Sequence, residues 1–474
     1  MSVINFNQLK SDNEKFRLDS EFFKKEFIES YVKIKKKKHI LVEDAISVLS
    51  DFHANGSYEV IAENFKLLDE PNFAYMVRST DLESNNFSDD VKYIDEHAYN
   101  FLSKTKLYGN ELLINKIGSP GRTYLMPKLN INCSLGMNLF MIRLKDNIGI
   151  TPAVAWVFLN TELGQNIILR KVNGTVPLTI DKMAVRSLYF PIFGEKFLKT
   201  IDALIENSKN NLSESKLVYQ KAEDLLLEEL GLRDFQPSEQ GINIKSLKDS
   251  FLSTGRLDAE YYQPKYEQIE SLITNYYRGA KKVSDEYELV TKKIDFTKQA
   301  YNYIEIGDIE ISSGSNTYNL VNTEDLPANA KIIPKLGDIL ISKVRPYRGA
   351  VSIIDNNIND LVVSGAFTVL RPKKESKYNV ELLKCLLRTK IYKDWLLKFN
   401  VGTSYPVIKD DDILNLPIPN VSIEIQNETS ELIQQSFALK AKSEQLLENA
   451  KTLVEMAIEQ DEEMALTNFE LGLA

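Results

Sequence analysis

The sequence predicts an α+β fold in which two domains of similar fold, related by a pseudo-two-fold, are separated by two long antiparallel coiled-coil helices. Three observations support this prediction: motifs that occur twice in the same order, short apolar runs between turn residues, and two long stretches with helical periodicity. A chain of 474 residues is also longer than one hydrophobic core normally organises. We therefore expect several domains that arose by duplication.

The motifs recur in two repeats, and each repeat is about half of the chain long. Residues 17–23 (Arg-Leu-Asp-Ser-Glu-Phe-Phe) return as residues 256–262 (Arg-Leu-Asp-Ala-Glu-Tyr-Tyr), and Gly174-Thr175 returns as Gly402-Thr403. Solenoid repeats have periods of about 20–50 residues, so a repeat of this length indicates a duplicated domain instead. A molecule with pseudo-two-fold symmetry suits a ligand that is itself two-fold repetitive, and duplex DNA is the commonest such ligand.

The texture of the sequence gives the domain boundaries. We predict a first domain over residues 1–193, a central long helix and linker over 194–235, a second domain over 236–421, and a C-terminal long helix and tail over 422–474. Within the domains, short apolar runs predict buried strands over 40–190 and 283–420. One helical stretch is expected inside each domain, over 152–172 and 379–399.

The two long helices have the same heptad register. Apolar and small residues follow a 3-4-3-4 spacing in both, and the matching positions lie 228 residues apart. We expect the helices to pair with each other in an antiparallel coiled coil, because one runs from the first domain to the second and the other runs back. The alternative is that each helix packs separately on its own domain. The apolar seam residues are Leu204, Val218, Leu225, Leu432, Leu446 and Leu453.

Two pairs of loops contain the candidate DNA-binding residues. The first pair follows the strands that end in Lys116 and Lys343, and the second pair follows the helical stretches. Arg can bind guanine with two hydrogen bonds, and Lys, Ser and Thr can bind phosphates. As ordinary surface turns these loops would look little different. The candidates are Lys116, Ser119, Arg122, Thr123 and Thr175 in the first repeat, and Lys343, Arg345, Tyr347, Arg348, Thr403, Ser404 and Tyr405 in the second.

Composition and missing motifs argue against an enzyme and against a metalloprotein. We find no glycine-rich phosphate loop, no methyltransferase Asn-Pro-Pro-Tyr or Asp-Pro-Pro-Tyr loop, and no Cys or His pair with metal-ligand spacing. The net charge of −9 speaks against a simple cationic DNA-binding protein but leaves room for a local basic face. No apolar stretch is long enough for a membrane span, and we expect a cytoplasmic protein in which Cys133 and Cys385 are buried free thiols.

The duplicated motifs resemble those of the DNA-specificity subunits of type I restriction–modification systems. The resemblance covers essentially the whole chain, and residues 255–262 (Gly-Arg-Leu-Asp-Ala-Glu-Tyr-Tyr) are its most specific element. The first copy departs from this motif, with Phe16 in place of Gly255 and Phe22-Phe23 in place of Tyr261-Tyr262.

The resemblance implies two target-recognition domains, each of which reads half of a bipartite, asymmetric target in double-stranded DNA. It also implies that the chain is a non-catalytic subunit. Two modification subunits would bind S-adenosylmethionine and methylate adenine N6, and restriction subunits would use ATP and Mg²⁺. Three alternatives remain open: the specificity subunit of another phage-defence methyltransferase, a coiled-coil scaffold with two protein-binding heads that does not bind DNA, and an enzyme with an unfamiliar site.

Overall fold

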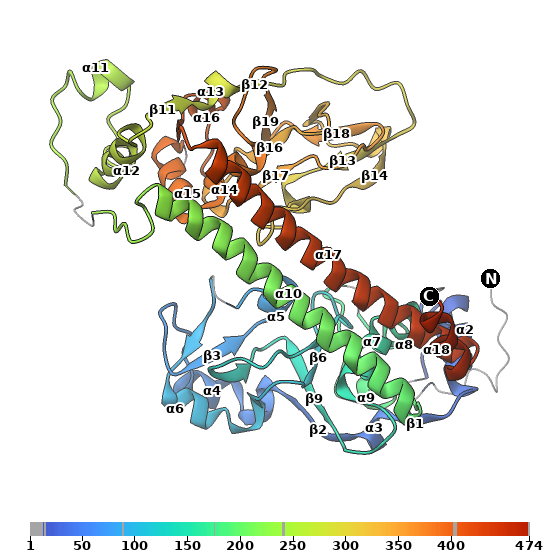
Figure 1. Cartoon of the computed structure of the whole chain (residues 1–474). Helices are drawn as coiled ribbons and strands as arrows, with labels where there is room; N and C mark the ends of the chain where they lie inside the picture. Colours follow the sequence, from blue (N-terminus) through green and yellow to red (C-terminus); the bar gives the residue numbers. More distant parts are fainter. Residues whose placement is uncertain are drawn as a thin grey trace. The chain divides into compact units, whose positions relative to one another are not determined.

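The computed structural model of the chain describes residues 13, 16–87, 90–174, 176–238, 242–401 and 405–472. Contacts divide the chain into two units: unit 1 comprises residues 1–212 and 440–474, and unit 2 comprises residues 213–439. Both units contain sheets and helices, which confirms the predicted α+β class. The two long helices, α10 (Glu195–Glu229) and α17 (Ile423–Glu459), each contribute one segment to each unit (Figure 1).

Unit 1 contains two four-stranded sheets and one two-stranded sheet, with the strand orders β2-β9-β6-β7, β4-β3-β8-β5 and β1-β10. All pairings are antiparallel except that of β3 with β8. The strands are β1 (His39–Leu41), β2 (Ile46–Asp51), β3 (Ala74–Val77), β4 (Tyr93–Ile94), β5 (Lys106–Leu107), β6 (Leu112–Asn115), β7 (Thr123–Leu125), β8 (Asn132–Leu135), β9 (Leu139–Leu144) and β10 (Tyr189–Pro191).

Unit 2 repeats this topology strand for strand, with the orders β12-β19-β16-β17, β14-β13-β18-β15 and β11-β20. The one parallel pairing recurs between β13 and β18. The strands are β11 (Ala280–Lys282), β12 (Tyr287–Leu289), β13 (Ala300–Ile304), β14 (Asn319–Asn322), β15 (Ala330–Ile332), β16 (Ile339–Ser342), β17 (Val351–Ile353), β18 (Leu361–Ser364), β19 (Phe367–Pro372) and β20 (Pro417–Pro419). The duplication seen in the sequence is therefore a duplication of fold.

Some of the shorter helices also correspond between the units. Those of unit 1 are α2 (Lys25–Lys35), α3 (Val42–Ala45), α4 (Tyr58–Asn64), α5 (Ser79–Glu83), α6 (Glu96–Phe101), α7 (Pro152–Leu159), α8 (Glu162–Leu169), α9 (Lys182–Arg186) and α18 (Glu462–Glu470). Those of unit 2 are α11 (Phe251–Thr254), α12 (Pro264–Thr274), α13 (Val283–Glu286), α14 (Val380–Arg388), α15 (Lys390–Leu396) and α16 (Asp410–Leu414). The helices α2, α3, α7, α8 and α9 have the same places in the strand order as α12, α13, α14, α15 and α16.

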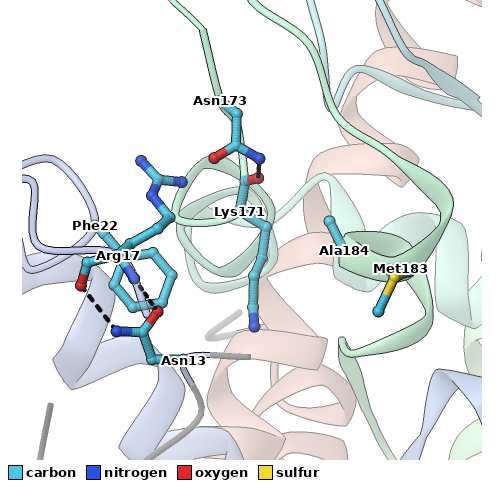
Figure 2. A pocket seen from close by; sticks show the side chains of 7 residues that line it. All are labelled: Asn13, Arg17, Phe22, Lys171, Asn173, Met183 and Ala184. Carbon is cyan, nitrogen blue, oxygen red and sulfur yellow. Dashed lines mark hydrogen bonds between the residues drawn. The ribbon is translucent and has the colours of Figure 1, made fainter. Parts of the chain in front are cut away.

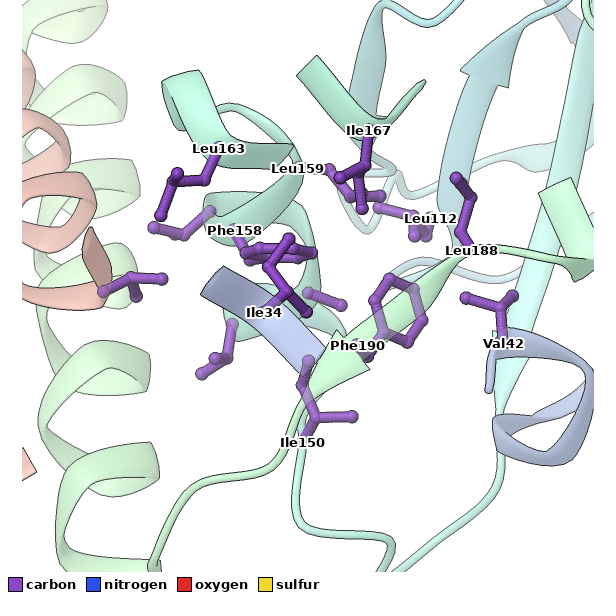
Figure 3. Close-up of a cluster of buried hydrophobic side chains, with 14 of the residues drawn as sticks. Ile34, Val42, Leu112, Ile150, Phe158, Leu159, Leu163, Ile167, Leu188 and Phe190 are labelled. Carbon is purple, nitrogen blue, oxygen red and sulfur yellow. The ribbon is translucent and has the colours of Figure 1, made fainter. Parts of the chain in front are cut away.

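The central strand β6 is buried on both faces. Leu112 and Ile114 pack into the cluster formed with the helices (Figure 3), whereas Leu113 packs against the second sheet. In unit 2, β16 divides its side chains in the same way, with Ile339 and Ile341 on the helix side and Leu340 on the other. This two-sided burial explains the continuous apolar runs, because each buried side chain of this size contributes about 2 kcal/mol to folding.

The single helical stretch expected in each domain is wrong in one detail, since both stretches are broken in two. The break occurs at Thr161 between α7 and α8, and at Thr389 between α14 and α15. Each threonine hydroxyl accepts a hydrogen bond from a backbone N–H of the second helix, that of Gly164 or that of Tyr392. The side chain thus caps a new helix, and this local bond interrupts an otherwise suitable apolar period.

The two long helices pair as predicted. In unit 1 the Ser208 and Ser443 hydroxyls lie 2.9 Å apart, and in unit 2 those of Ser215 and Ser436 lie 3.0 Å apart. Each step of seven residues along α10 therefore matches a step of seven back along α17, so the helices are antiparallel. Ser208 and Ser443 also donate to each other's carbonyl oxygens at 2.8 and 2.7 Å, so the backbones approach closely.

Besides pairing with each other, the two long helices pack on the domain cores, which is the packing that the alternative prediction proposed. Leu204, Val218 and Leu453 are buried, whereas Leu225, Leu432 and Leu446 are only half-buried. Leu226 and Ile433, the neighbours of two of them, are almost fully buried in the core of unit 2. A helix has 3.6 residues per turn and drifts against a heptad repeat, so the domain core takes up the neighbouring position.

The predicted domain boundaries lie close to the starts of the long helices, since α10 begins at Glu195 and α17 at Ile423. The contacts instead divide the chain within both helices, after Leu212 and after Leu439. Among the described residues, no helix is both long and apolar enough to cross a membrane.

Candidate nucleic-acid interface

The two candidate loops of each unit lie side by side. In unit 1, Ile117 pairs with Thr179 in an antiparallel bridge, and the Ile180 N–H donates to the Lys116 carbonyl at 3.0 Å. In unit 2, Val344 pairs with Val407 in the same way, and a 3.0 Å bond from Ile408 N–H to the Lys343 carbonyl recurs. We call residues 116–123 with 173–179 the loop pair of unit 1, and residues 343–349 with 401–407 the loop pair of unit 2. Thr175, Thr403 and Ser404 lie outside the described residues.

The repeated Arg-Leu-Asp motif holds the second loop of each pair. Arg17 donates to the carbonyl oxygens of Arg170 and Val172 at 3.3 and 2.7 Å. Arg256 donates to those of Phe399 and Asn400 at 3.3 and 3.0 Å. These carbonyls immediately precede the Gly-Thr loops. The motif, which in the sequence indicated only a resemblance, therefore anchors the second candidate loop of each unit.

An aspartate two residues later orients each of these arginines. The ion pairs Arg17–Asp19 and Arg256–Asp258 measure 2.7 and 2.6 Å. Their hydrogen bonds hold the pKa values of both aspartates below the ordinary value. In unit 1, Arg17 and Phe22 line a small pocket together with Lys171, Asn173 and Met183 (Figure 2).

Lys116 lies beneath the loop pair of unit 1 and not on its surface. It forms a 3.0 Å ion pair with Asp51, which also binds Lys182 at 2.6 Å. Burial disfavours the charged carboxylate of Asp51, but the hydrogen bonds from both lysines outweigh it, so the pKa of Asp51 is lowered. This geometry favours a structural role for Lys116, while the predicted DNA contact stays a prediction.

Beneath the loop pair of unit 2 lies an equivalent ion pair whose carboxylate comes from a different element. Lys343 binds Asp410 at 3.1 Å, and Asp410 also accepts a 2.6 Å hydrogen bond from the Thr368 hydroxyl. Asp410 occupies the position that Lys182 holds in unit 1, 228 residues earlier. The acid thus comes from the helix α16 in unit 2 and from the strand β2 in unit 1, yet both carboxylates hold the lysine that follows the central strand.

The remaining candidates of unit 1 differ in accessibility. Ser119 and Arg122 are exposed, and Arg122 forms a 3.3 Å ion pair with Glu83 at the end of α5. Thr123 is buried, and its hydroxyl accepts a 2.7 Å hydrogen bond from Asn160. Arg122 can therefore reach a ligand if Glu83 releases it, and Thr123 fastens the loop to α7.

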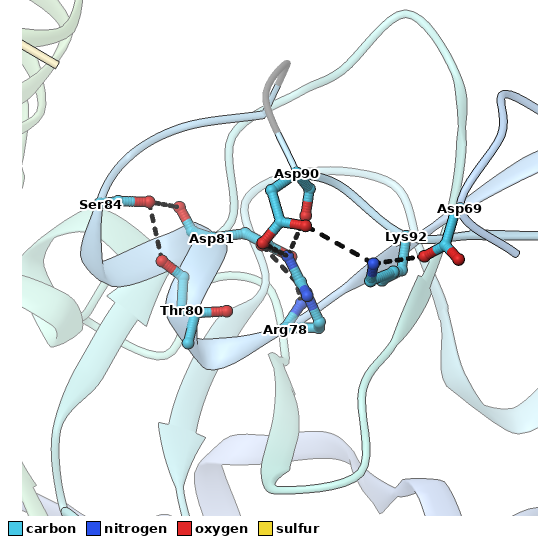
Figure 4. A network of polar contacts seen from close by, with 7 residues as sticks. All are labelled: Asp69, Arg78, Thr80, Asp81, Ser84, Asp90 and Lys92. Atoms are coloured by element: carbon cyan, nitrogen blue, oxygen red, sulfur yellow. Dashed lines mark hydrogen bonds and ion pairs between the residues drawn. The ribbon is translucent and has the colours of Figure 1, made fainter. Parts of the chain in front are cut away.

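A polar network holds α5 in place next to Arg122. Asp81 is buried, accepts from the Arg78 N–H at 2.8 Å and pairs with the Arg78 guanidinium at 2.7 Å (Figure 4). In unit 2, Asp308 caps the equivalent turn by accepting from the Glu305 N–H at 2.8 Å. The capping aspartate is present in both units, whereas the residue three positions before it is a cation, Arg78, in unit 1 and an anion, Glu305, in unit 2.

The loop pair of unit 2 presents guanidinium and aromatic groups together. The Arg345 guanidinium lies 4.4 Å from the centre of the Tyr405 ring, a cation–π contact. Tyr347 and Arg348 are exposed, and within the described part of the chain neither Arg345 nor Arg348 forms an ion pair. These two cations are therefore available to a ligand.

Arg345 has a left-handed backbone conformation, with φ at 49°. This conformation costs a residue other than glycine about 1–2 kcal/mol. Two hydrogen bonds maintain it, one from the Arg345 N–H to the Pro406 carbonyl at 2.8 Å and one from the Arg348 N–H to the Arg345 carbonyl at 3.0 Å. The conformation is characteristic of functional loops.

Arg388, which the sequence analysis missed, ties this loop to a long helix. It donates to the Tyr219 hydroxyl on α10 at 3.0 Å, to the Gly349 carbonyl at 3.4 Å and to the Ser312 carbonyl at 2.9 Å. Asn160 occupies the equivalent position in unit 1 and binds Thr123 instead. The shared 228-residue offset between Asn160 and Arg388 was the signal that could have identified both.

Further exposed residues of unit 1 were also missed, and they are apolar. Ile117, Val176, Leu178 and Met183 lie in the loop pair or directly after it, and all four are exposed. Sequence patterns alone did not single them out, because isolated apolar residues between turn residues are common.

The two cysteines of the chain are buried thiols. Cys133 and Cys385 are free and buried, as predicted, and burial raises the pKa of each to about 12. The described residues contain no group of three or more His, Cys, Asp or Glu side chains that could hold a metal ion.

Comparison with known proteins identifies the part of the chain that contains the second loop pair. Residues 280–450 match the family model of the type I restriction modification DNA specificity domain. A curated relative, the type I restriction enzyme HindI specificity subunit of Haemophilus influenzae, is 29% identical over 149 residues. This match covers 30% of the chain and 32% of the relative, so the chain spans about a third of the relative's length.

Two solved structures are similar over most of their length. The S subunit of a type I restriction-modification system from M. genitalium is 14% identical, with a TM-score of 0.41 over 89% of this chain and 95% of that one. The HsdS subunit from Thermoanaerobacter tengcongensis is 13% identical, with a TM-score of 0.28 over 90% and 97%.

Both matches are to specificity components of type I systems, in agreement with the prediction of a specificity subunit. Residues 280–450 thus match the type I restriction modification DNA specificity domain, which supports the resemblance carried by the repeated motifs.

Proposed function

We propose that this chain binds double-stranded DNA sequence-specifically and directs partner adenine-N6 methyltransferase subunits to a bipartite, asymmetric target. Each unit reads one half of the target with its loop pair. S-adenosylmethionine is bound by the modification subunit, and the target adenine is flipped out and methylated there.

One observation carries this proposal: two loop pairs of different composition stand on the same scaffold. The bridges Ile117–Thr179 and Val344–Val407 and the arginines Arg17 and Arg256 recur in both units, whereas the exposed side chains differ. Two domains that recognise different base sequences require a constant scaffold with different exposed loops. Contacts to bases determine which sequence is bound, whereas contacts to phosphates only position the protein on the DNA.

Partner subunits complete the proposed complex. We infer two modification subunits that dock on α10 and α17, and restriction subunits that use ATP and Mg²⁺. A system without restriction subunits would be the related phage-defence methyltransferase considered above. Co-purification of the chain with the products of neighbouring genes separates these two cases.

The first experiment measures binding of the purified chain, alone and with its modification subunits, to duplex DNA at several salt concentrations. The logarithm of the affinity should fall linearly with the logarithm of the salt concentration, with a slope of about −0.9 per phosphate contacted. The chain alone should not methylate DNA. A protein-binding scaffold would show neither specific DNA binding nor this slope.

The second experiment tests the spacing function that we propose for the long helices. Seven residues are added to both α10 and α17, near Ser215 and Ser443, which keeps the heptad register and lengthens each helix by about 10 Å. At about 3.4 Å per base pair, the gap between half-sites should grow by up to about three base pairs. Lengthening only one helix should instead weaken binding. An unchanged gap in an active, doubly lengthened complex rejects the spacing function.

A further inference from the structure

Four apolar side chains are exposed together at the loop pair of unit 1. Their exposed fractions are 39% for Ile117, 93% for Val176, 44% for Leu178 and 66% for Met183. We call these four residues the apolar patch. The Ile117–Thr179 bridge brings the first loop beside the segment that contains Leu178, and α9, which begins at Lys182, carries Met183.

Ion pairs and backbone hydrogen bonds fasten the segments that carry the apolar patch. Lys116 and Lys182, which flank it in sequence, both bind the buried carboxylate of Asp51. Asn173 and Thr179 close the second loop with a pair of 2.8 Å backbone hydrogen bonds. Apolar groups exposed on a fixed loop of a folded domain mark a binding surface more strongly than scattered apolar residues do.

Two cations, Lys182 and Arg122, belong to the same part of unit 1 as the apolar patch. Lys182 is partly exposed beside Met183, and Arg122 is exposed on the first loop but paired with Glu83. In unit 2 the corresponding loops present Arg345 stacked on Tyr405 and exposed Arg348, beside exposed Val401 and Val407. The two loop pairs therefore offer different chemistry to the same kind of ligand.

The C5 methyl group of thymine is the apolar group that base pairs present in the major groove of DNA. Aliphatic and thioether side chains contact this methyl group, whereas guanidinium groups bind the acceptors of guanine. We propose that the apolar patch reads thymine methyl groups in the half-site bound by unit 1. This inference rests on the proposed function.

Removal of single methyl groups from the DNA tests the inference. Once the methylated motif is known, its two halves are assigned to the units by replacement of residues 40–190. Deoxyuridine then replaces thymine in one half at a time, which deletes the methyl group and keeps all hydrogen-bonding groups. We expect the affinity of the full-length chain, with its modification subunits, to fall about fourfold for each contacted methyl in the half-site of unit 1. The same replacement in the other half should change affinity less than twofold.

Variants of the protein provide the matching half of the test. Val176→Ser and Met183→Gln should weaken binding to the thymine duplex but not to the deoxyuridine duplex. Tyr108→Ser is the control, because Tyr108 is an exposed residue of unit 1 that precedes β6, at the end of that strand away from the loop pair. It should leave both affinities unchanged.

The outcomes separate the inference from the proposed function. Specific binding that is equal for thymine and deoxyuridine in this half overturns the inference and leaves the proposed function intact. Loss of modification-subunit binding in Met183→Gln, with DNA affinity unchanged, also overturns it, because the patch would then be a protein-docking surface. Absence of specific binding to any duplex rejects the proposed function itself.

Discussion

The loop pairs of the two units rest on the same scaffold and differ in what they expose. Beneath the loops, a lysine at the end of the central strand is held by a carboxylate in both units, Lys116 by Asp51 and Lys343 by Asp410. Above them, unit 1 presents the apolar patch, whereas unit 2 presents Arg345 and Arg348 beside exposed Val401 and Val407. After duplication the positioning contacts were kept, even when the acid moved to another element, while the exposed side chains diverged.

The largest expected difference between the units concerns these carboxylates. Asp51→Asn leaves two lysines without their partner in a largely buried site, so we expect unit 1 to lose about 3–5 kcal/mol of stability. Asp410 is about one-third exposed and binds one lysine, so Asp410→Asn should cost unit 2 only about 1 kcal/mol. Chemical denaturation of both variants measures the difference. Equal losses would show that the two networks do not differ in burial as the structure indicates.

The same network predicts a pH dependence for unit 1. The pKa of Asp51 is lower in the folded protein than its ordinary value, so its contribution is complete above about pH 4. It is lost as the pH falls through the folded pKa. Denaturation of the wild type between pH 7 and pH 3 should therefore show a loss of stability at the acid end that the Asp51→Asn variant lacks.

The anchoring arginines should, by contrast, be equivalent. Arg17→Ala and Arg256→Ala each remove charge-assisted hydrogen bonds to backbone carbonyls, which contribute about 1.5–3 kcal/mol. We expect similar losses of stability in the two variants. Specific DNA affinity should fall with each, because the Gly-Thr loops lose their anchors. A silent Arg17→Ala next to a damaging Arg256→Ala would break the symmetry of the scaffold.

The smallest expected effect on folding, and a large one on binding, belongs to Arg345. Arg345→Gly removes the guanidinium but suits a backbone φ of 49°, so stability should stay constant or rise by about 1 kcal/mol. Specific DNA affinity should drop by about 1–3 kcal/mol if Arg345 reads a base. Arg348→Ala is the matched variant without the backbone effect. Equal loss of specific and nonspecific affinity in either variant would assign that arginine to a phosphate.

The sequence predicted the fold, because the fold follows from repetition. The matching positions of the long helices anticipated the Ser208–Ser443 and Ser215–Ser436 contacts. The equivalent strands β6 and β16 were visible in the sequence as apolar runs. The 228-residue offset between equivalent positions does not, however, indicate which side chains are buried. Lys116 and Thr123 therefore looked as accessible as Arg122, although tertiary contacts bury both.

Two other features depended on contacts between distant segments. Asp51 reaches Lys116 across 65 residues, and Arg388 reaches Tyr219 across 169. No local pattern announces such partners. The breaks at Thr161 and Thr389 were missed for a different reason, since a threonine cap within an apolar period looks like an ordinary helical residue.

The most direct test of the account is the methylated motif of a chimera. Residues 40–190, which include the loop pair of unit 1 and none of unit 2, are replaced by the equivalent region of a relative, and the modified bases of the host genome are mapped. The account predicts that one half of the motif changes while the other half and the gap are retained. A motif in which both halves change, or in which neither does, would contradict the claim that each unit reads its own half.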